Sequence, residues 1–466
     1  MRRNVWYALG MLLGVPALLA GQGFGVYEHG TCTMGRSGVA TAMPCADGSA
    51  IFYNPAGLAG LSGTRIMAGA TLITASGAFT DDATGQAWDL DNPPIPVPHL
   101  YVTHAFSPKF TAGVGVFVPY GLETRWPSDA AYDSVTGTTR PTSQLFPGRF
   151  LGWNSKLQSI YVQPTVAYQV HPRLQLGIGV SYIHSKVDLK QRVDLSEQDV
   201  PGQTFTFALL GIPTGSDFAE AHLDASGSSV SANIGAILQV TSKLWFGARY
   251  LTEAKVDYDG TADFTQLQTG LTLAPGNPLT GVATPVDVLV APNFAAGAPL
   301  SDTPAKTSIK MPAQFSAGLA WQATAAVTLM ADYQYVHWKS FDQLVLDFEN
   351  ALAPDVTLNE NYKDTHGFRF AAEWTYSPKL TFRGGYLTHT AAAPDETVTP
   401  LLPEGARNEL TAGIGYQLAS ALRADIAYQY IRQDHRRGRV FDETVGNTGL
   451  YTFKAHLFGL SLAYTF

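Results

Sequence analysis

The chain contains 466 residues, of which 45% are hydrophobic and 15% are charged, and its formal net charge is −8. This acidic balance, without any basic patch, argues against a nucleic-acid partner. After the N-terminus, no apolar run reaches the roughly 18 residues that a membrane-spanning helix needs. The apolar residues instead alternate with polar ones, as the strands of a membrane barrel require.

Residues 1–23 are expected to form a secretory signal peptide. Arg2 and Arg3 precede a short apolar core that ends in small residues, and the mature chain is expected to begin between residues 21 and 24. An uncleaved anchor helix is the alternative, but Gly14 and Pro16 interrupt the apolar core.

Cys32 and Cys45 are the only cysteines of the chain. They lie close together in the mature N-terminal region, and an oxidising periplasm favours a disulfide between them. Such a bond would contribute about 3 kcal/mol by loop closure. The alternative is a pair of free, buried thiols.

Residues 24–64 are expected to form a hatch. They are rich in Gly, Ala and Ser and include the sequence from Ile51 to Leu58, IFYNPAGL. A segment of about forty residues is too short to fold as a stable domain without help. We therefore expect it to fill the lumen of a barrel built by residues 65–466.

From residue 65 onward, strand-like segments are joined alternately by short and by long connections. The short ones lie at residues 107–109, 171–172, 241–243, 323–325, 377–379 and 419–420. Tight periplasmic turns and long outer loops are typical of a transmembrane β-barrel. Alternating side chains within each segment agree, as in Ile160, Val162 and Val166, which share one face.

The count predicts an all-β, 14-stranded antiparallel transmembrane barrel. Strands are expected near residues 65–79, 97–107, 109–119, 156–170, 173–190, 218–240, 243–259, 306–322, 325–340, 361–376, 379–390, 406–418, 421–433 and 450–466. The third strand ends with Pro119 and Gly121, which weaken a ladder and make a gap in the wall plausible. The alternative is that Pro119 only terminates the strand.

Two of the long connections are unusually apolar. They contain Phe205, Phe207, Leu209, Leu210 and Ile212 after the fifth strand, and Leu271, Leu273, Val282, Val286, Val288, Leu289 and Val290 after the seventh. So much apolar surface in outer loops points to capture of a hydrophobic molecule. The alternative is a lid whose loops pack on each other, and the two can hold together.

Four arginines are expected to point into the lumen: Arg249, Arg369, Arg383 and Arg423. Most of them should pair with acids inside the barrel, because an unpaired interior charge is unfavourable. One that is left over could bind the carboxylate of a fatty acid. The sequence does not say which one.

Several motifs, in this order and spacing, resemble the FadL/TodX/OmpP1 family of outer-membrane transporters. The resemblance covers nearly the whole mature chain and rests on Tyr27-Glu28, Asn54-Pro55-Ala56, the segments 118–122, 146–150, 338–342 and 361–364, and the terminal Tyr464-Thr465-Phe466. It implies a hatch that closes the barrel and a kink in the third strand that releases cargo sideways. It also implies that Asn54, Pro55 and Ala56 lie against that kink, with Asn54 bonded to the backbone that the kink leaves unpaired.

The implied function is outer-membrane transport of long-chain fatty acids or similar hydrophobic molecules. Uptake of aromatic hydrocarbons is one alternative, and a general aqueous porin is another, although a plug and apolar loops do not suit a water-filled pore. We find no Gly-x-Ser-x-Gly motif and no metal-ligand spacing, and so expect neither enzyme activity nor a metal or cofactor. The expected partners are hydrophobic small molecules, outer-membrane lipid and the barrel assembly machinery, with the protein acting as a monomer.

Overall fold

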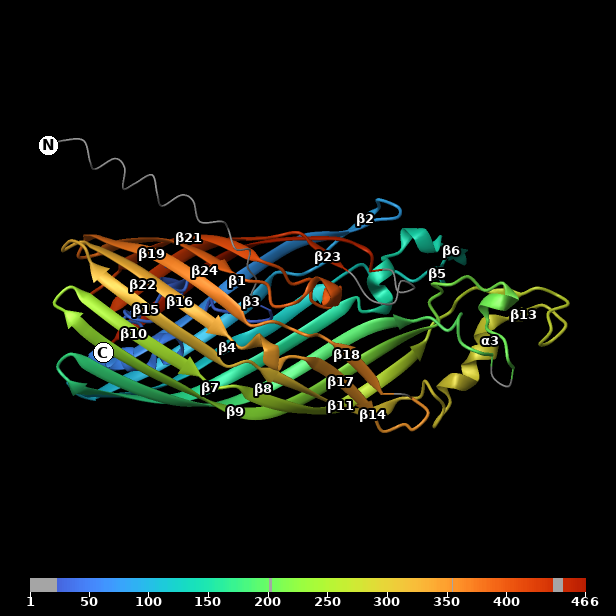
Figure 1. Cartoon of the computed structure of the whole chain (residues 1–466), viewed down its shortest axis with the longest axis horizontal. Helices are drawn as coiled ribbons and strands as arrows, with labels where there is room; N and C mark the ends of the chain where they lie inside the picture. Colours follow the sequence, from blue (N-terminus) through green and yellow to red (C-terminus); the bar gives the residue numbers. More distant parts are fainter. Residues whose placement is uncertain (1–22, 201–202, 354, 439–446) are drawn as a thin grey trace.

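A computed structural model of the chain describes residues 23–466 except 201–202, 354 and 439–446. The predicted signal peptide, residues 1–23, therefore lies almost entirely outside the described residues. The remaining chain forms an antiparallel barrel (Figure 1), closed where β1 pairs with β24 from Arg65 opposite Thr465 to Asp81 opposite Gly449. None of the described helices is long and apolar enough to cross a membrane.

Fourteen strands build the wall, which confirms the predicted fold class. They are β1 (Thr64–Asp81), β3 (Ile95–Ser107), β4 (Phe110–Arg125), β7 (Asn154–His171), β8 (Leu174–Val193), β9 (Ala219–Thr241), β10 (Leu244–Leu251) with β11 (Ala254–Gln266), β14 (Thr303–Met311) with β15 (Gln314–Gln322), β16 (Val327–Val336), β19 (Thr365–Ser377), β20 (Leu380–His389), β21 (Arg407–Gln417), β22 (Leu422–Gln433) and β24 (Gly449–Thr465).

Side-chain alternation sets the two faces of the wall. On β8, the side chains of Leu176, Ile178 and Val180 are exposed, while the residues between them are buried glycines. The exposed row suits lipid, and the glycines leave room for whatever fills the lumen. The predicted pattern of lipid-facing residues therefore follows from the strand period alone.

Two predicted strands differ from the expectation because each is broken. The stretch 243–259 is interrupted at residues 252–253, and the stretch 306–322 at 312–313. Pro312 has no N–H to donate to a ladder. Opposite it, the Thr252 hydroxyl takes over a ladder position by accepting from the N–H of Ala232 at 2.9 Å. Strand ten also starts later than predicted, at Thr365, because Asn361 has a positive φ of 49° that interrupts an extended chain.

The short turns and the long connections lie at opposite ends of the barrel (Figure 1). The long connections carry β2 (Ala87–Asp89), β5 (Tyr132–Asp133), β6 (Thr138–Thr139), η2 (Thr142–Gln144), η3 (Pro147–Phe150), η4 (Ala208–Leu210), β12 (Thr272–Leu273), β13 (Thr284–Pro285), α3 (Val286–Val290), η5 (Ala291–Phe294), η6 (Trp338–Ser340), β17 (Gln343–Phe348), β18 (Val356–Asn359), η7 (Asp395–Thr397) and β23 (Arg436–Gly438). This asymmetry is the one that the sequence predicts.

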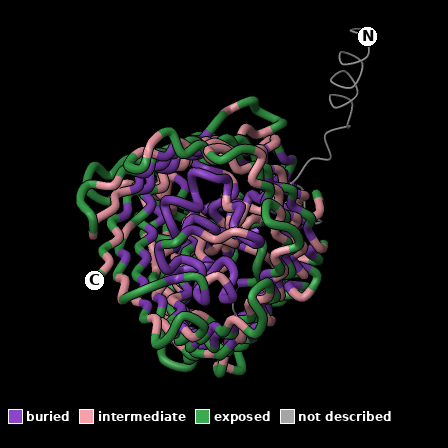
Figure 2. Tube along the Cα trace, turned by 90° about the vertical axis from the view of Figure 1, so that its left-hand side faces the viewer, coloured by how far each residue is buried: buried purple, intermediate pink, exposed green. Residues whose placement is uncertain are grey.

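The segment before β1 lies inside the barrel. It forms α1 (Thr31–Met34), α2 (Ala50–Tyr53) and η1 (Pro55–Gly60), and Figure 2 shows buried chain filling the interior of the ring of strands. Its apolar side chains, among them Ile51, Phe52 and Leu58, join the same buried cluster as side chains of the wall. Residues 23–63 therefore lie inside the barrel, and we call them the hatch.

Candidate functional site

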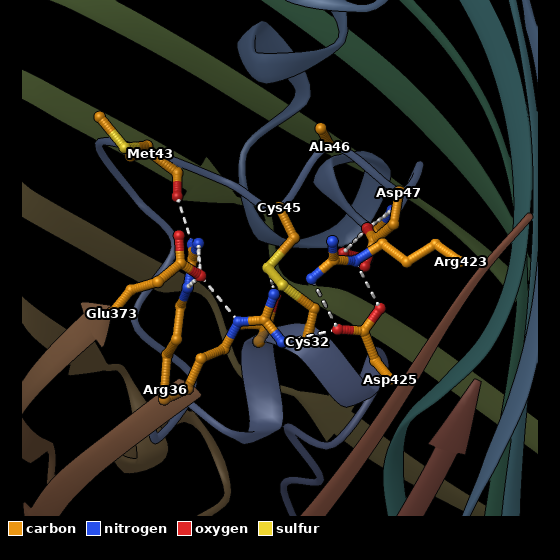
Figure 3. The surroundings of a disulfide bond; sticks show 12 residues. Cys32, Arg36, Met43, Cys45, Ala46, Asp47, Glu373, Arg423 and Asp425 are labelled. Carbon is orange, nitrogen blue, oxygen red and sulfur yellow. Dashed lines mark hydrogen bonds and ion pairs between the residues drawn. A yellow bond between two sulfur atoms is a disulfide. The ribbon is translucent and has the colours of Figure 1, made fainter. Parts of the chain in front are cut away.

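Most of the hatch, Thr31–Leu58, is fastened at several points, and we call it the tethered segment. The structure pairs Cys32 with Cys45, whose Cα atoms are 6.3 Å apart (Figure 3). This is the disulfide that the sequence favoured. It closes the loop that holds Arg36 and Thr41, both of which contact the barrel wall.

Buried ion pairs connect the tethered segment to the wall (Figure 3). The Nε atom of Arg36 lies 3.1 Å from Oε2 of Glu373 on β19, and the same oxygen accepts from Arg383 at 2.7 Å. Arg383 also donates to Asp425 at 2.6 Å, and Asp425 accepts from Arg423 at 3.1 Å. Hatch and wall therefore share one chain of alternating charges.

Asn54 anchors the far end of the tethered segment, but not where we expected. Its Nδ2 atom donates to the carbonyl oxygens of Thr41 at 2.6 Å, of Ala236 on β9 at 3.2 Å and of Ala248 on β10 at 3.3 Å. Gly235 makes this possible, because a Cβ atom there would lie 1.9 Å from Oδ1 of Asn54.

The other two residues of the triplet lie on the same side of the lumen. A Cβ atom at Gly177 of β8 would lie 2.3 Å from the backbone of Pro55 and 2.5 Å from that of Ala56. The triplet is thus packed against β8, β9 and β10, and its predicted position against the third-strand kink was wrong.

The kink itself lies in β4. The β3–β4 ladder stops at Leu100 opposite Val116, and the β4–β7 register shifts between Phe117 and Tyr120. Val118 and Pro119 therefore form a bulge, which bends a strand. Proline and glycine occur where the sequence predicted a gap, and β4 continues beyond them to Arg125.

The first part of the hatch, Gly23–His29, pairs with β4 at this bulge, and we call it the N-terminal segment. The N–H of Val26 donates to the carbonyl of Pro119 at 2.9 Å, and the N–H of Gly121 donates to the carbonyl of Phe24 at 2.9 Å. Hydrogen bonds to the open backbone of the kink thus come from this segment and not from Asn54.

His29 ends the N-terminal segment in an apolar pocket. Its ring lies 4.6 Å from that of Phe52 and 5.7 Å from that of Phe117, measured between centroids. Burial, with a smaller contribution from the neighbouring His99, lowers the pKa of His29 to about 3. The imidazole is therefore neutral at pH 7.

A cavity of about 300 Å³ lies beside the bulge. The N-terminal segment forms one side of it, through Gly23, Val26 and Glu28, and the β4 residues Val118 and Gly121 form another. The wall contributes both polar and apolar residues to the lining, and the apolar ones include Ile73, Ile95, Pro96, Val97, Leu122, Leu157, Ile431 and Leu457. The cavity therefore reaches from the lumen to the place where β3 and β4 separate.

Comparison with known proteins identifies the family. Residues 17–466 match the family described as "Outer membrane protein transport protein (OMPP1/FadL/TodX)". The chain belongs to this family of outer-membrane transport proteins. It is 22% identical to the long-chain fatty acid transport protein of Escherichia coli over 95% of this chain and 94% of that protein.

Two solved structures have the same fold. A Pseudomonas aeruginosa FadL homologue has a TM-score of 0.75, with 20% identity over 96% of this chain and 100% of that one. The P. putida toluene transporter TodX has a TM-score of 0.70, with 18% identity over 96% and 99%. The family consists of transport channels for hydrophobic compounds, which agrees with the expectation that the chain is not an enzyme.

The four lumen arginines of this family member all serve the hatch or the wall. Arg383 and Arg423 belong to the chain of ion pairs. Arg249 donates to Asn233 and Gln314, each at 3.0 Å, and Arg369 donates to Gln334 at 2.7 Å. None of the four lines the cavity beside the bulge.

Two cations do line this cavity, Lys156 and Arg407. Lys156 lies 3.4 Å from the carboxylate of Glu123, whereas Arg407, which the sequence reasoning did not single out, has no such partner in the described part of the chain. It begins β21 and lies 3.4 Å from the amide oxygen of Gln433. Among the described residues, no carboxylate oxygen lies within 4.0 Å of its guanidinium nitrogens. Strand alternation could have found it, because it shares a face with the buried Glu409.

The predicted capture loops form a hydrophobic cluster of their own. Phe207, Ile212 and Val286 are buried in it, and Phe205, Leu210 and Leu289 are partly buried. Leu209 and Val288 remain 76% and 64% exposed. The loops therefore pack on each other, as the lid alternative expected, and still present apolar side chains to the outside.

Proposed function

We propose that this transporter carries long-chain fatty acids from the cell exterior into the outer membrane. The cargo first meets Leu209 and Val288 on the outer loops, then enters the cavity beside the bulge, and leaves sideways between β3 and β4. The observation that carries the proposal is the cavity, which places an arginine, an apolar lining and the opening in the wall side by side.

A fatty acid needs a cation for its carboxylate and an apolar wall for its chain. Arg407 supplies the first, and residues such as Ile95, Val97 and Leu457 supply the second. The volume of about 300 Å³ is at the small end of ligand pockets, which range over roughly 300–1,000 Å³. The E. coli relative is named for the same cargo.

Aromatic hydrocarbons are a second candidate cargo. Glu28, Glu404 and Glu409 line the same cavity, and their charge would oppose a carboxylate but not a neutral molecule. The TodX structure belongs to a toluene transporter. An aqueous porin is disfavoured, because the described hatch residues fill the lumen with buried side chains.

Competitive equilibrium binding to the purified barrel separates the two cargoes. Arg407→Met removes the charge but keeps the length, and we expect it to weaken binding of a long-chain fatty acid by about tenfold or more, because hydrogen bonds to charged groups contribute roughly 1.5–3 kcal/mol. Toluene binding should not change. The matched control is Arg432→Met, since Arg432 is exposed on β22. Toluene binding without fatty-acid binding would establish the hydrocarbon alternative, and binding of neither would contradict both.

The C-terminus supports the remaining expectations about biogenesis. Phe466 is exposed, and its N–H donates to the carbonyl of Thr64 at 2.8 Å, so the terminal aromatic residue lies at the seam that closes the barrel. We propose that the assembly machinery recognises Tyr464-Thr465-Phe466 there. Since the barrel closes within one chain, we also propose that the transporter works as a monomer.

A further inference from the structure

The edge of β3 beside the opening is unusual because it contains two prolines. The β3–β4 ladder covers residues 100–107 of β3, so residues 95–99 have no partner on β4. On its other side, the same stretch is paired with β1, from Ile73 opposite Ile95 to Gly69 opposite His99. One edge of β3 is therefore satisfied and the other is open.

The backbone groups of Pro96 and Pro98 are the ones that face the opening. The N–H of Ala105 donates to the carbonyl of Gly63, which continues the pairing of β3 with β1. Backbone groups of successive residues point to opposite sides of a strand, so the odd-numbered residues of β3 face β1 and the even-numbered ones face β4. Proline has no N–H. Within the open stretch, this edge therefore offers carbonyl groups and no donor.

The opposite edge of the opening is already occupied. Beyond the bulge, the N-terminal segment bonds to the carbonyl of Pro119 and to the N–H of Gly121, where β3 would otherwise pair. Closer to the long loops, the wall is closed again, since the N–H of Asp91 donates to the carbonyl of Arg125 at the end of β4, at 2.8 Å. The opening is thus a window with a proline edge on β3 and a hatch-covered edge on β4.

The window opens into an apolar part of the outer surface. Leu72, which lies opposite Pro96, is 42% exposed, and Leu100 at the last ladder pair is 43% exposed. A backbone N–H facing lipid without a partner is strongly unfavourable, and it would be driven to bond to a neighbouring strand. With proline at both positions, no such N–H is present.

We propose that Pro96 and Pro98 are positioning residues that prevent β3 from pairing with β4 or with the N-terminal segment, and so keep the window in the wall open to cargo. This inference rests on the proposed lateral release. It assigns the open state of the window to the missing donors on β3 as well as to the bulge on β4. Prolines are tolerated there because the edge is unpaired.

The test is the full-length Pro96→Ala/Pro98→Ala variant in phosphatidylcholine vesicles, with a pyrene-labelled fatty acid as probe. We expect the two restored N–H groups to donate hydrogen bonds to neighbouring backbone, so that their amide hydrogens exchange slowly. One or two added hydrogen bonds across the window should reduce the rate of probe transfer to the lipid by about tenfold. Because Pro96 also lines the cavity, transfer by the double variant is compared with that of the wild type at equal occupancy by the probe. The equilibrium affinity should not change in Pro98→Ala, since Pro98 does not line the cavity. If the double variant does not insert into the vesicles, Pro98→Ala alone is used for the same measurement.

Pro164→Ala is the matched control. Pro164 is likewise an exposed proline inside a wall strand, β7. The N–H of Gln169 on β7 donates to the carbonyl of Lys109, next to β4, so the backbone groups of odd-numbered residues face β4. Those of the even-numbered Pro164 therefore face β8 and not the window. Its substitution should leave transfer unchanged. Wild-type transfer rates in the double variant, or an equal loss in Pro164→Ala, would overturn the proposal.

The place where the wild-type protein delivers the probe distinguishes failure of the proposed function from failure of the inference about the prolines. If the wild-type protein delivers the probe to the aqueous interior of the vesicle and not to its lipid, lateral release itself is wrong, and the role of the prolines is overturned with it. If the wild type delivers to lipid and the double variant does so equally fast, only the inference about the prolines is overturned.

Discussion

The two parts of the hatch are held in different ways. The tethered segment has a disulfide, a buried pair between Arg36 and Glu373, and the hydrogen bonds of Asn54 to two strands. Among the described residues, the N-terminal segment has neither a disulfide nor an ion pair to the wall, and hydrogen bonds hold it instead. Two are backbone bonds to β4, and others are side-chain bonds, such as Tyr27 to Gln314 at 2.6 Å and Gln429 to Glu28 at 2.9 Å. Yet the cavity and the window lie beside the N-terminal segment. If cargo leaves as proposed, we expect only the segment without a disulfide or an ion pair to move, while the tethered segment stays in place and excludes water.

Removal of Glu373 should have the largest effect, because its ion pair with Arg36 is a contact to the wall of a kind that the N-terminal segment lacks. Glu373→Ala leaves Arg36 and Arg383 without their shared carboxylate, and breaking a buried ion pair destabilises by about 3–5 kcal/mol. We expect the tethered segment to detach and steady ion conductance to appear in planar bilayers. Asp129→Ala is the control, since its pair with Arg140 is exposed and should contribute about 0–1 kcal/mol. Unchanged conductance in Glu373→Ala would show that the ion pairs do not hold the hatch.

Loss of the disulfide should have the next largest effect. The bond closes a loop with a sequence separation of 13, for which chain entropy gives about 3 kcal/mol. Cys32→Ser/Cys45→Ser should lower the denaturant concentration at which the hatch unfolds and raise ion leakage. The barrel itself should stay folded, as measured by its heat-modifiable mobility in gel electrophoresis. Reduction of the wild-type protein should reproduce the variant. An effect on cargo transfer without any leakage would contradict the division of the hatch into two parts.

The barrel could be predicted from the sequence because its rules are local. Strand alternation and turn length do not depend on distant partners, and they predicted the fourteen strands. Pro119 and Gly121 are equally local signals, and they predicted a gap where the structure has the bulge. The breaks at residues 252–253 and 312–313 escaped prediction because they arise from one strand adjusting to its neighbour.

The site was harder to predict, since its contacts join residues far apart in the chain. Asn54 was misplaced because Gly235, which makes room for it, lies on β9, three strands away from β4. The four expected arginines do point inward, but which cation remains without a carboxylate depends on the positions of Glu373 and Asp425 relative to the hatch. Arg407 could therefore be recognised only once the lumen contacts were known.

Acidification should affect the N-terminal segment alone, and by the smallest amount. His29 has a pKa of about 3 in the folded hatch, below its usual value near 6.5, so its stabilising contribution is complete above pH 6.5 and is lost as the pH falls toward 3. Between pH 7 and pH 5 the loss is about 2 kcal/mol, if the segment's release exposes the imidazole to water. Among the groups that face His29, His99 and Arg249 also lower its pKa, while the carbonyl of Val26, 2.9 Å from Nε2, raises it without restoring the usual value. Hydrogen exchange of residues 23–29, corrected for the slower intrinsic exchange at lower pH and compared with that of His29→Gln at the same pH, should accelerate at pH 5 in the wild type only. His171→Gln, at an exposed turn, should behave as the wild type. If the tethered segment accelerated equally, the two parts would open as one unit, and the contrast between them would not describe how the hatch works.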